Sequence, residues 1–331
     1  MRMQFIRNVY RNVLPKSIRG PIRMWRLERE FHPDAEVEFY GAYDLMLRHL
    51  GEKRLPYLQR KRINWQHGWI PDYFHHGSND PFDVVQNFTW SKPDYFNLVA
   101  RKTQERRMQE LGVTNSLAVG LPIVYFPQTM TAATNGALLI MPGHSLDYIS
   151  QQTMEEEYVS YIDSIRHRFT AVTVCVHPSC ARNGYWIDSF KKRGYSIVMG
   201  VEIDDSAAFE KLQRYFSDHE FCTTNKWGSH VVYAALFGCK VSIIGSEPML
   251  SLEDFENSVH WANKDDKRQL HRHYEQLSNS VFGTYYPEFF VEHPGTAVRN
   301  VELARFECGY DNRINPAQYR QVTEWVARDS Y

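Results

Sequence analysis

Polar side chains that suit phosphate chemistry gather at two points in the second half of the chain. His177, Pro178 and Ser179 directly follow the apolar run AVTVCV. A second polar group begins at the end of the run EFCTT and comprises Thr223, Thr224, Asn225, Ser229 and His230. Hydroxyl, amide and imidazole groups can all donate hydrogen bonds to phosphate oxygens. The spacing therefore predicts a phosphate-binding site built from two separate turns.

The two turns offer different donors. An imidazole at the end of a strand can donate to a leaving phosphate, and Pro178 stiffens the turn that presents His177. A helix is predicted to begin near Ser229, where free backbone amides and the helix dipole favour an anion. Each residue also has a structural interpretation, with His177 as an ordinary hydrogen-bonded histidine and Ser229 as a helix N-cap.

A third candidate, His67, lies in the segment QHGW of the first half. It follows an apolar segment and precedes Gly68, so its side chain can project into a cleft. There it could act as a general base and take a proton from an acceptor hydroxyl, that is, the hydroxyl of a substrate that receives a transferred group. One alternative is a buried, hydrogen-bonded histidine. Another is that Asp72, Asp80 or Asp83 in the same loop acts as the base.

The turn after the run GALLIM adds Gly143 and His144 to the candidate ligand-binding residues. Glycine has no side chain, so the backbone at Gly143 can approach a ligand closely. This argument is a weaker form of the one for the other two turns, because it rests on one glycine and one histidine.

These candidates need a sheet to position them. Five apolar, β-rich runs alternate with helix-period segments over residues 136–246: GALLIM, AVTVCV, YSIVMG, EFCTT and KVSIIG. Such alternation is typical of βαβ units and a parallel sheet. Ligands of open α/β sheets bind outside the carboxyl ends of the strands, which is where the polar turns lie.

The first half shows the same pattern less clearly. We expect a short strand and a helix within 36–51, a strand running into a loop at 63–85, a strand at 96–100, a helix at 102–112 and a strand at 116–126. A terminal helix is predicted at 315–330, with Asn315 as its N-cap and Pro316 at its first position.

The predicted fold class is therefore α/β with two Rossmann-like domains, because 331 residues exceed one typical core. We expect four parts: a basic amphipathic segment at 1–30, an acceptor-side domain at 31–130, a nucleotide-binding domain at 131–300, and a helical return at 301–331 that packs back toward the first domain.

Composition narrows the class of function. The net charge of −1 gives no sign of a nucleic-acid-binding protein. Five dispersed cysteines without a CxxC pair fit a reducing compartment, and Cys175 and Cys222 are predicted to be small core residues. We expect neither a transmembrane helix nor a signal peptide. These features favour a cytoplasmic protein.

The N-terminal segment 1–30 is strongly basic, in contrast to the nearly neutral chain as a whole. Its eight basic residues alternate with apolar ones: Arg2, Arg7, Arg11, Lys16, Arg19, Arg23, Arg26 and Arg29. One interpretation is adsorption to an anionic membrane surface, which would make the protein peripheral on the inner face of the cytoplasmic membrane. The other is an ordinary helix packed on its own domain.

Several other classes lack their motifs. The sequence has no GxGxxG, no GxxxxGK[ST] and no GxSxG, which argues against dinucleotide dehydrogenases, P-loop enzymes and α/β-hydrolases. The pairs His75-His76 and His271/His273 lack metal-ligand spacing, so no metal is expected.

Taken together, these motifs resemble those of bacterial glycosyltransferases with two Rossmann domains, the B-type fold. The His-Pro pair at 177–178 and the Thr/Ser-rich turn at 223–229 are similar to the two CMP-binding motifs of bacterial sialyltransferases and Kdo transferases. QHGW resembles the His-Gly motif of CDP-glycerol glycerophosphotransferases, which implies that His67 is the acceptor-side base. The acidic motif that carries the base in many bacterial sialyltransferases is absent here.

The resemblance implies a metal-independent glycosyltransferase of capsule or lipopolysaccharide synthesis. The expected donor is a CMP-activated acidic sugar, sialic acid or Kdo, used as a substrate with no separate cofactor. The acceptor would be a glycan or lipid-linked glycan. Alternatives are a transferase for UDP- or GDP-sugars, a CDP-polyol phosphotransferase, and a non-catalytic subunit that binds a nucleotide or glycan.

Overall fold

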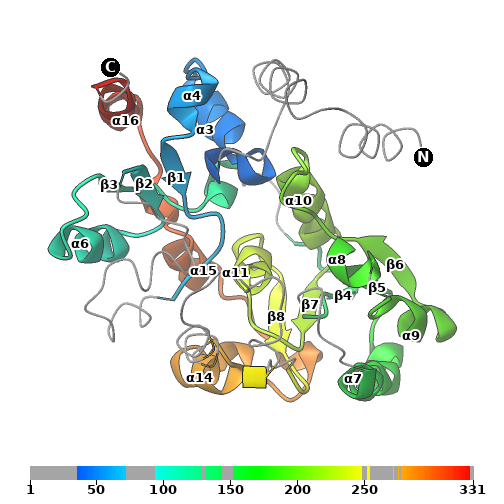
Figure 1. Ribbon diagram of the computed structural model, residues 1–331. Helices are drawn as coiled ribbons and strands as arrows, with labels where there is room; N and C mark the ends of the chain where they lie inside the picture. The colour runs from blue at the N-terminus through cyan, green and yellow to red at the C-terminus, as the bar shows by residue number, and fades with distance from the viewer. Residues whose placement is uncertain are drawn as a thin grey trace.

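The computed structural model describes residues 36–71, 94–127, 132–143, 152–182, 184–247 and 277–328, with a few isolated residues between 252 and 275. It is an α/β structure with two parallel sheets, one of three strands and one of five (Figure 1). The segment 1–30, His144, and the aspartates at 72, 80 and 83 lie outside the described residues.

The first sheet contains β1 (Ile63–Trp65), β2 (Phe96–Val99) and β3 (Ser116–Ala118) in that order, all parallel. The predicted strands at 63, 96 and 116 are therefore confirmed, although β3 ends early and gives way to η3 (Pro122–Tyr125). The helices of this part are α3 (Ala42–Leu50), α4 (Tyr57–Arg60) and α6 (Lys102–Glu110).

The predicted short strand within 36–51 is wrong. The chain instead forms η1 (Glu36–Gly41), a 3₁₀ segment in which Tyr40 and Gly41 have φ of 60° and 75°. The buried carboxylate of Glu38 explains the difference, because it is held by Arg54 and by Arg60, whose Nε lies 2.8 Å away. These ion pairs tie the segment to Arg54 and to Arg60 at the end of α4, in a conformation that is not extended.

The second sheet has the strand order β6-β5-β4-β7-β8, with every pair parallel. All five predicted apolar runs form its strands: β4 (Leu138–Ile140), β5 (Val172–Val176), β6 (Ser196–Met199), β7 (Phe221–Thr224) and β8 (Lys240–Ile243). The connecting helices are α7 (Gln152–Ile165), α8 (Pro178–Arg182), α9 (Ile187–Lys192), α10 (Ala208–Asp218) and α11 (Ser229–Leu236), with η4 (Arg166–Arg168) after α7.

Helices cover both faces of this sheet. Leu138 and Ile140 of β4 pack in one apolar cluster with residues of α7 and α9, whereas Leu139 between them packs in the cluster that includes α10 and α11. Successive side chains of a strand point to opposite faces, so an unbroken apolar run is what a strand buried on both faces requires.

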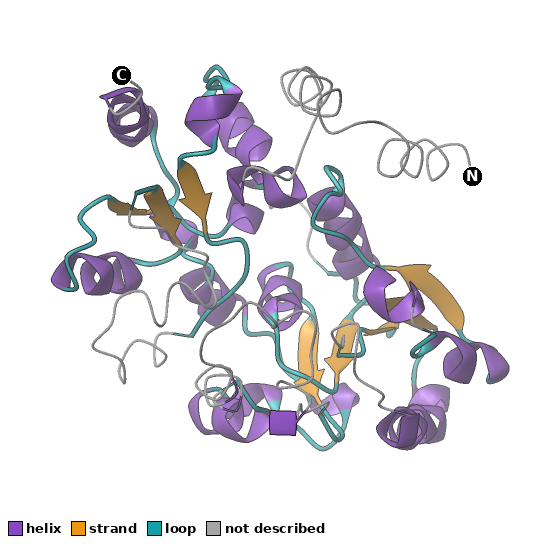
Figure 2. Cartoon of the chain, in the orientation of Figure 1, coloured by secondary structure: helices purple, strands orange, loops and turns teal. Residues whose placement is uncertain are grey.

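Helix α11 lies between the two sheets (Figures 1 and 2). Every residue from Val231 to Phe237 is buried, and α11 packs against α15 (Val301–Glu307). One apolar cluster contains buried residues of both sheets and of α11. The two sheets fall within the predicted ranges 31–130 and 131–300, but this shared core does not test those boundaries, which stay predictions.

The last part of the chain returns to the first sheet. It contains α14 (Asn279–Tyr285), η5 (Pro287–Phe289), η6 (Pro294–Thr296), α15, η7 (Tyr310–Asn312) and α16 (Pro316–Arg328). Helix α16 packs against β2 and α4, and the Trp325 ring meets Phe96 edge-on at 5.4 Å. The predicted cap is confirmed, because Asn315 Oδ1 accepts from the backbone N–H groups of Ala317 and Gln318 at 3.0 Å.

All five cysteines are buried and free, which confirms the prediction that Cys175 and Cys222 are core residues.

In the described part of the chain, no helix has both the length and the apolar character that crossing a membrane requires.

Candidate functional site

The second sheet reverses its direction of growth between β4 and β7. Its order, numbered from β4, is 3-2-1-4-5, so the chain moves outward through β5 and β6 and then crosses back to β7 and β8. At such a switch point the loops after the two central strands diverge and leave room for a ligand at their carboxyl ends. The candidate site is therefore the edge that carries the loops after β4 and β7, with His177 after β5.

Asn225 joins the two central loops. Its Oδ1 accepts from the backbone N–H of Gly143 at 2.8 Å, and its Nδ2 donates to the carbonyl of Ser246 at 2.9 Å. The Gly143 carbonyl in turn accepts from Nε1 of Trp186 at 3.2 Å. Asn225 is fully buried, so it holds the ends of β4, β7 and β8 together at the edge where a ligand would sit.

The two threonines of the same turn bond within the protein. Thr223 accepts from the Ser242 hydroxyl at 2.8 Å, which links β7 to β8. The Thr224 hydroxyl donates to the Lys226 carbonyl at 3.1 Å and accepts from the Lys226 N–H at 3.2 Å. Both side chains are fully buried. They shape the turn, and their contact with a phosphate stays a prediction.

His177 has a defined orientation at the end of β5. Its Nδ1 lies 3.2 Å from the donating backbone N–H of Ser179 and 2.6 Å from the Ser179 hydroxyl. An Nδ1 that accepts a hydrogen bond is unprotonated, so the neutral ring carries its hydrogen on Nε2. Pro178 begins α8 beside it. Because β5 and β7 are separated by one strand, His177 and Thr224 are about 10 Å apart across the sheet.

Ser229 joins the two halves of the molecule. Its Oγ accepts from the backbone N–H of Trp69 at 2.8 Å, and its hydroxyl also bonds to Tyr233, one turn along α11. The Tyr233 hydroxyl donates to the carbonyl of His67 at 3.2 Å. This ring of contacts, which we call the 67–233 clamp, fixes the QHGW segment against the start of α11. His230, the next residue of α11, is half-buried and packs over Gly228.

His67 lies at the end of β1, beside the clamp. Its ring meets Phe39 edge-on at 5.1 Å and lies 6.3 Å from Tyr40. Nδ1 is buried and has no hydrogen-bond partner among the described residues. Burial lowers the pKa of His67 to about 4, so the ring is neutral near pH 7. Tyr40 adopts the left-handed conformation there, which is rare for an aromatic residue.

Lys226 is a residue of this edge that the sequence analysis passed over. Its Nζ lies 4.0 Å from Oε2 of Glu247, and the two side chains are only 15% and 13% exposed. Burial lowers the pKa of Lys226 to about 8, although the charge of Glu247 opposes the shift. The signal was present in the sequence: a lysine lies two residues after a buried strand, inside the turn TTNKWG.

Glu247 and α14 hold Lys226 in place from the other side. Oε1 of Glu247 accepts from the backbone N–H of Asn279 at 2.6 Å, and Asn279 Oδ1 accepts from the N–H of Trp227 at 2.9 Å. Asn279 also donates to the carbonyl of Asn225 at 2.9 Å. Burial raises the pKa of Glu247. The switch-point edge thus carries one buried ammonium–carboxylate pair in a hydrogen-bonded frame.

A second ionic cluster connects the first sheet to the last part of the chain. The Glu307 carboxylate pairs with Arg101 and accepts from Nε1 of Trp69 at 2.7 Å and from the Tyr286 hydroxyl at 3.0 Å. Arg101 also donates to the Ile70 carbonyl at 2.6 Å. All of these charges are satisfied by protein partners, so we assign the cluster to structure and not to the site.

Within the described ranges, no group of three or more His, Cys, Asp or Glu side chains has an arrangement that could hold a metal ion.

The structure gathers Asn225, Lys226 and Gly143 at one edge of the second sheet, and it places His177 after the neighbouring strand. His67 and Ser229 lie in the contact between the two sheets.

Comparisons with protein-family models and with curated proteins give no match.

Proposed function

We propose that the protein is a metal-independent glycosyltransferase that uses a CMP-activated acidic sugar, sialic acid or Kdo, to extend a glycan of capsule or lipopolysaccharide. In this proposal the two sheets are the cores of the two Rossmann-like domains of a B-type glycosyltransferase. The observation that carries the proposal is the 3-2-1-4-5 strand order, with a partly buried cation, Lys226, at the switch point.

The donor would lie across the carboxyl ends of β5, β4 and β7. Nε2–H of His177 would donate to the phosphate of the departing CMP, and the ammonium of Lys226 would offset its negative charge. A nucleoside monophosphate leaving group carries one phosphate, so a hydrogen bond from a neutral histidine and the charge of one ammonium would stabilise it without a divalent cation. Asn225 and Gly143 would shape the floor of the site.

The acceptor would approach from the first sheet, where His67 would take the proton of its attacking hydroxyl. Support comes from the position of His67 at the end of β1 and from its unpartnered Nδ1 among the described residues. The 67–233 clamp would set the distance between this base and the donor site, because it joins His67 to the helix that follows β7.

Lys226 also favours a second candidate, a transferase whose donor carries a diphosphate, such as a UDP- or GDP-sugar or a CDP-polyol. A leaving group with two phosphates bears more charge, and an ammonium at the switch point would stabilise it further. The two candidates differ in the nucleotide they bind, which makes them separable by direct measurement.

The test is a binding panel of CMP, CDP, UMP, UDP and GDP, read by thermal shift and calorimetry. We expect CMP to bind most tightly and to raise the melting temperature, because a ligand of the native state stabilises it. Preference for a diphosphate would select the second candidate. Binding of a nucleotide without transfer of any activated sugar would favour a non-catalytic subunit, and no binding at all would contradict the proposal.

A matched pair of lysines assigns the site. Lys226→Met, made together with Glu247→Gln so that no partly buried charge is left without its partner, should weaken nucleotide binding at least ~10-fold. The control is Lys240→Met, since Lys240 pairs with Glu220 at 2.8 Å at the opposite, amino end of β8. Equal losses in both variants would remove the switch point as the binding site.

We further propose that the protein is cytoplasmic and peripheral to the inner face of the cytoplasmic membrane through residues 1–30. Deleting this segment, or raising the salt concentration, should reduce binding to anionic vesicles in a sedimentation assay. Neutral vesicles are the control. If the intact protein ignores anionic vesicles at low salt, the segment is only structural.

A further inference from the structure

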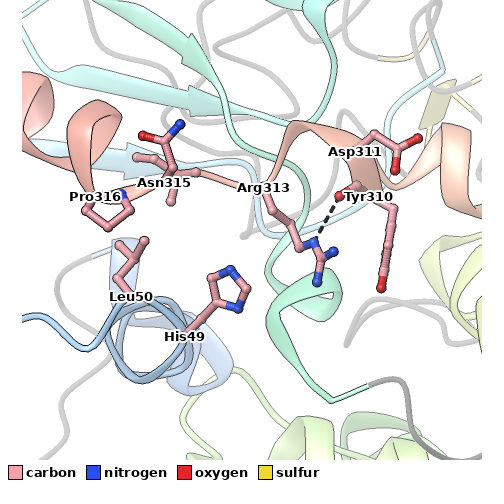
Figure 3. Close-up of a pocket in the computed structure, with 8 residues that line it drawn as sticks. His49, Leu50, Tyr310, Asp311, Arg313, Asn315 and Pro316 are labelled. Carbon is pink, nitrogen blue, oxygen red and sulfur yellow. Dashed lines mark hydrogen bonds between the residues drawn. The ribbon is translucent and has the colours of Figure 1, made fainter.

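A cavity lies in the first-sheet part of the molecule, outside the candidate donor site. Its volume is about 350 Å³, and it opens between the end of α3 and the segment that leads into α16. Its lining includes His49, Leu50, Tyr310, Arg313 and Pro316 (Figure 3). Cavities of this size hold small molecules in other proteins.

Arg313 is fixed at one side of this cavity. Its Nε donates to the Tyr310 carbonyl at 3.1 Å, and its guanidinium lies 3.9 Å from the centre of the Tyr310 ring. Among the described residues, no carboxylate comes within ion-pair distance of Arg313. Its two terminal nitrogens are therefore available to an oxyanion, which a guanidinium binds with two parallel hydrogen bonds.

The nearest acidic side chain already has a partner of its own. Asp311 lines the cavity, but its carboxylate lies 3.7 Å from Arg305. Arg305 stacks on the same Tyr310 ring at 4.3 Å and also pairs with Glu302 at 3.7 Å. Two arginines thus contact the Tyr310 ring. Of these two, Arg305 has carboxylate partners among the described residues and Arg313 has none.

His49 supplies a second nitrogen donor. In Figure 3 the Arg313 guanidinium lies between His49 and Tyr310. Burial and the charge of Arg313 both lower the pKa of His49, so the ring is neutral near pH 7 and offers one N–H. The His49 ring is held edge-on against Tyr125 at 5.3 Å, and the Tyr125 hydroxyl is fixed by Ile314 N–H at 2.7 Å.

We infer that this cavity binds the phosphoryl group of a phosphomonoester, with Arg313 and His49 as its donors. A guanidinium fork and an imidazole together offer three N–H groups to the three free oxygens of a phosphomonoester, whereas a carboxylate has only two. The apolar side chains of Leu50, Ile314 and Pro316 leave space for the body of the molecule. This inference does not rest on the proposed transferase activity.

The test is calorimetry on the full chain at constant ionic strength, with glycerol 3-phosphate, inorganic phosphate and acetate as probes. We expect glycerol 3-phosphate to bind more tightly than acetate by at least ~10-fold. No binding of glycerol 3-phosphate, equal binding of acetate, or binding of inorganic phosphate alone would each overturn the inference.

Variants locate the binding. Arg313→Gln should weaken glycerol 3-phosphate at least ~10-fold, and His49→Gln by a smaller factor. Arg320→Gln is the matched control: it removes an exposed arginine of α16 that does not line the cavity and should leave affinity within about twofold. Equal losses for Arg320→Gln and Arg313→Gln would mean general charge attraction and would contradict the site.

Arg313→Lys keeps the charge but loses the planar fork, and it serves if Arg313→Gln proves unstable. It should bind less tightly than the unmodified chain, whereas unchanged affinity would contradict a bidentate contact. Melting temperatures without ligand show which variants are folded. Nucleotide binding, measured in parallel, should be the same in all of these variants, which separates a failure here from a failure of the proposed function.

Discussion

The two ring nitrogens of His177 have different roles. Nδ1 accepts a hydrogen bond from Ser179, so Nε2 is the ring nitrogen that carries the hydrogen. We predict that His177→Ala lowers turnover by ~10²-fold or more, the scale for losing one donor to a developing negative charge. Single-turnover assays with a CMP-sugar would measure it, with circular dichroism to show that the fold is intact.

Ser179→Ala is an informative companion to His177→Ala. It removes the hydroxyl contact but keeps the backbone N–H that fixes the tautomer. We therefore expect a much smaller loss of turnover than for His177→Ala. Turnover like that of the unmodified protein in His177→Ala would exclude the proposed role of this residue.

His67 makes a prediction about acid stability. Its pKa is lowered from about 6.5 to about 4 by burial, so between these values the unfolded chain binds a proton that the folded chain does not. Stability therefore falls as the pH drops from 6.5 toward 4 and is unaffected by this group above 6.5. His67→Gln should flatten this dependence in urea titrations at several pH values. His167→Gln, on the exposed turn η4, is the matched removal of a histidine.

The same residue is the proposed base. His67→Ala should abolish sugar transfer and leave nucleotide affinity unchanged, because the proposed donor site is on the other sheet. If His67 acts in the free enzyme, the acid limb of kcat/KM should lie near its pKa of about 4. Near-normal transfer by His67→Ala, with loss in a variant of Asp72, Asp80 or Asp83, would make the base a carboxylate.

At the scale of elements, the 67–233 clamp makes Ser229 part of the contact between the first sheet and α11. Ser229→Ala leaves the Trp69 N–H without its acceptor, and we predict a loss of about 1–3 kcal/mol in the free energy of unfolding. Tyr233→Phe should cost less, because it removes the bonds of its hydroxyl to the His67 carbonyl and to Ser229 but leaves the Trp69 N–H with its acceptor. Urea unfolding of the two single variants and the double variant gives the coupling between them.

Calorimetry with CMP on the same variants separates two roles of Ser229. A loss of affinity in Ser229→Ala but not in Tyr233→Phe would indicate a direct contact with the phosphate. Equal losses in both would show that the clamp acts by positioning the loop. Unchanged affinity in Ser229→Ala, and in its combination with a replacement of Thr224, would remove this turn from the phosphate site.

The strands of the second sheet could be predicted because the residues within each run are enough to indicate a strand. Each run of the second sheet is apolar throughout, and a strand covered on both faces needs that pattern. The segment 36–41 was not predictable, because its shape depends on ion pairs from Glu38 to two arginines well along the chain. The order of the strands in the sheet could not be predicted from the sequence either. The contact between Asn225 and Gly143 depends on that order, because it requires β4 and β7 to be neighbours.

Part of the candidate site could also be predicted from neighbouring residues in the sequence. The polar turns after β5 and β7 are visible as residues that follow apolar runs. Whether a polar atom in such a turn is free depends on partners far along the chain. Ser242 binds Thr223 and Trp69 binds Ser229, and neither partner is indicated by local spacing. Lys226 gains its importance from burial beside Glu247, 21 positions further along.

At the scale of the whole molecule, the Arg101–Glu307 pair joins the start of α6 to α15. Both side chains are less than a tenth exposed. Glu307→Gln leaves a buried guanidinium without its counter-charge, and we predict a loss of about 3–5 kcal/mol in the free energy of unfolding. The control is Arg166→Gln, which removes an exposed pair with Asp163 and should cost less than about 1 kcal/mol. Similar losses in the two variants, measured by urea unfolding, would contradict a structural role for the buried pair.

The rings of Trp69 and Trp227 lie 5.1 Å apart with 53° between their planes, and they come from opposite halves of the molecule. Two indoles this close and this inclined share their excited states, so the pair should give a split band in circular dichroism that neither tryptophan gives alone. The band would vanish in Trp69→Phe or Trp227→Phe. The protein therefore carries a built-in optical marker, and its loss during a titration would report that the two halves have separated.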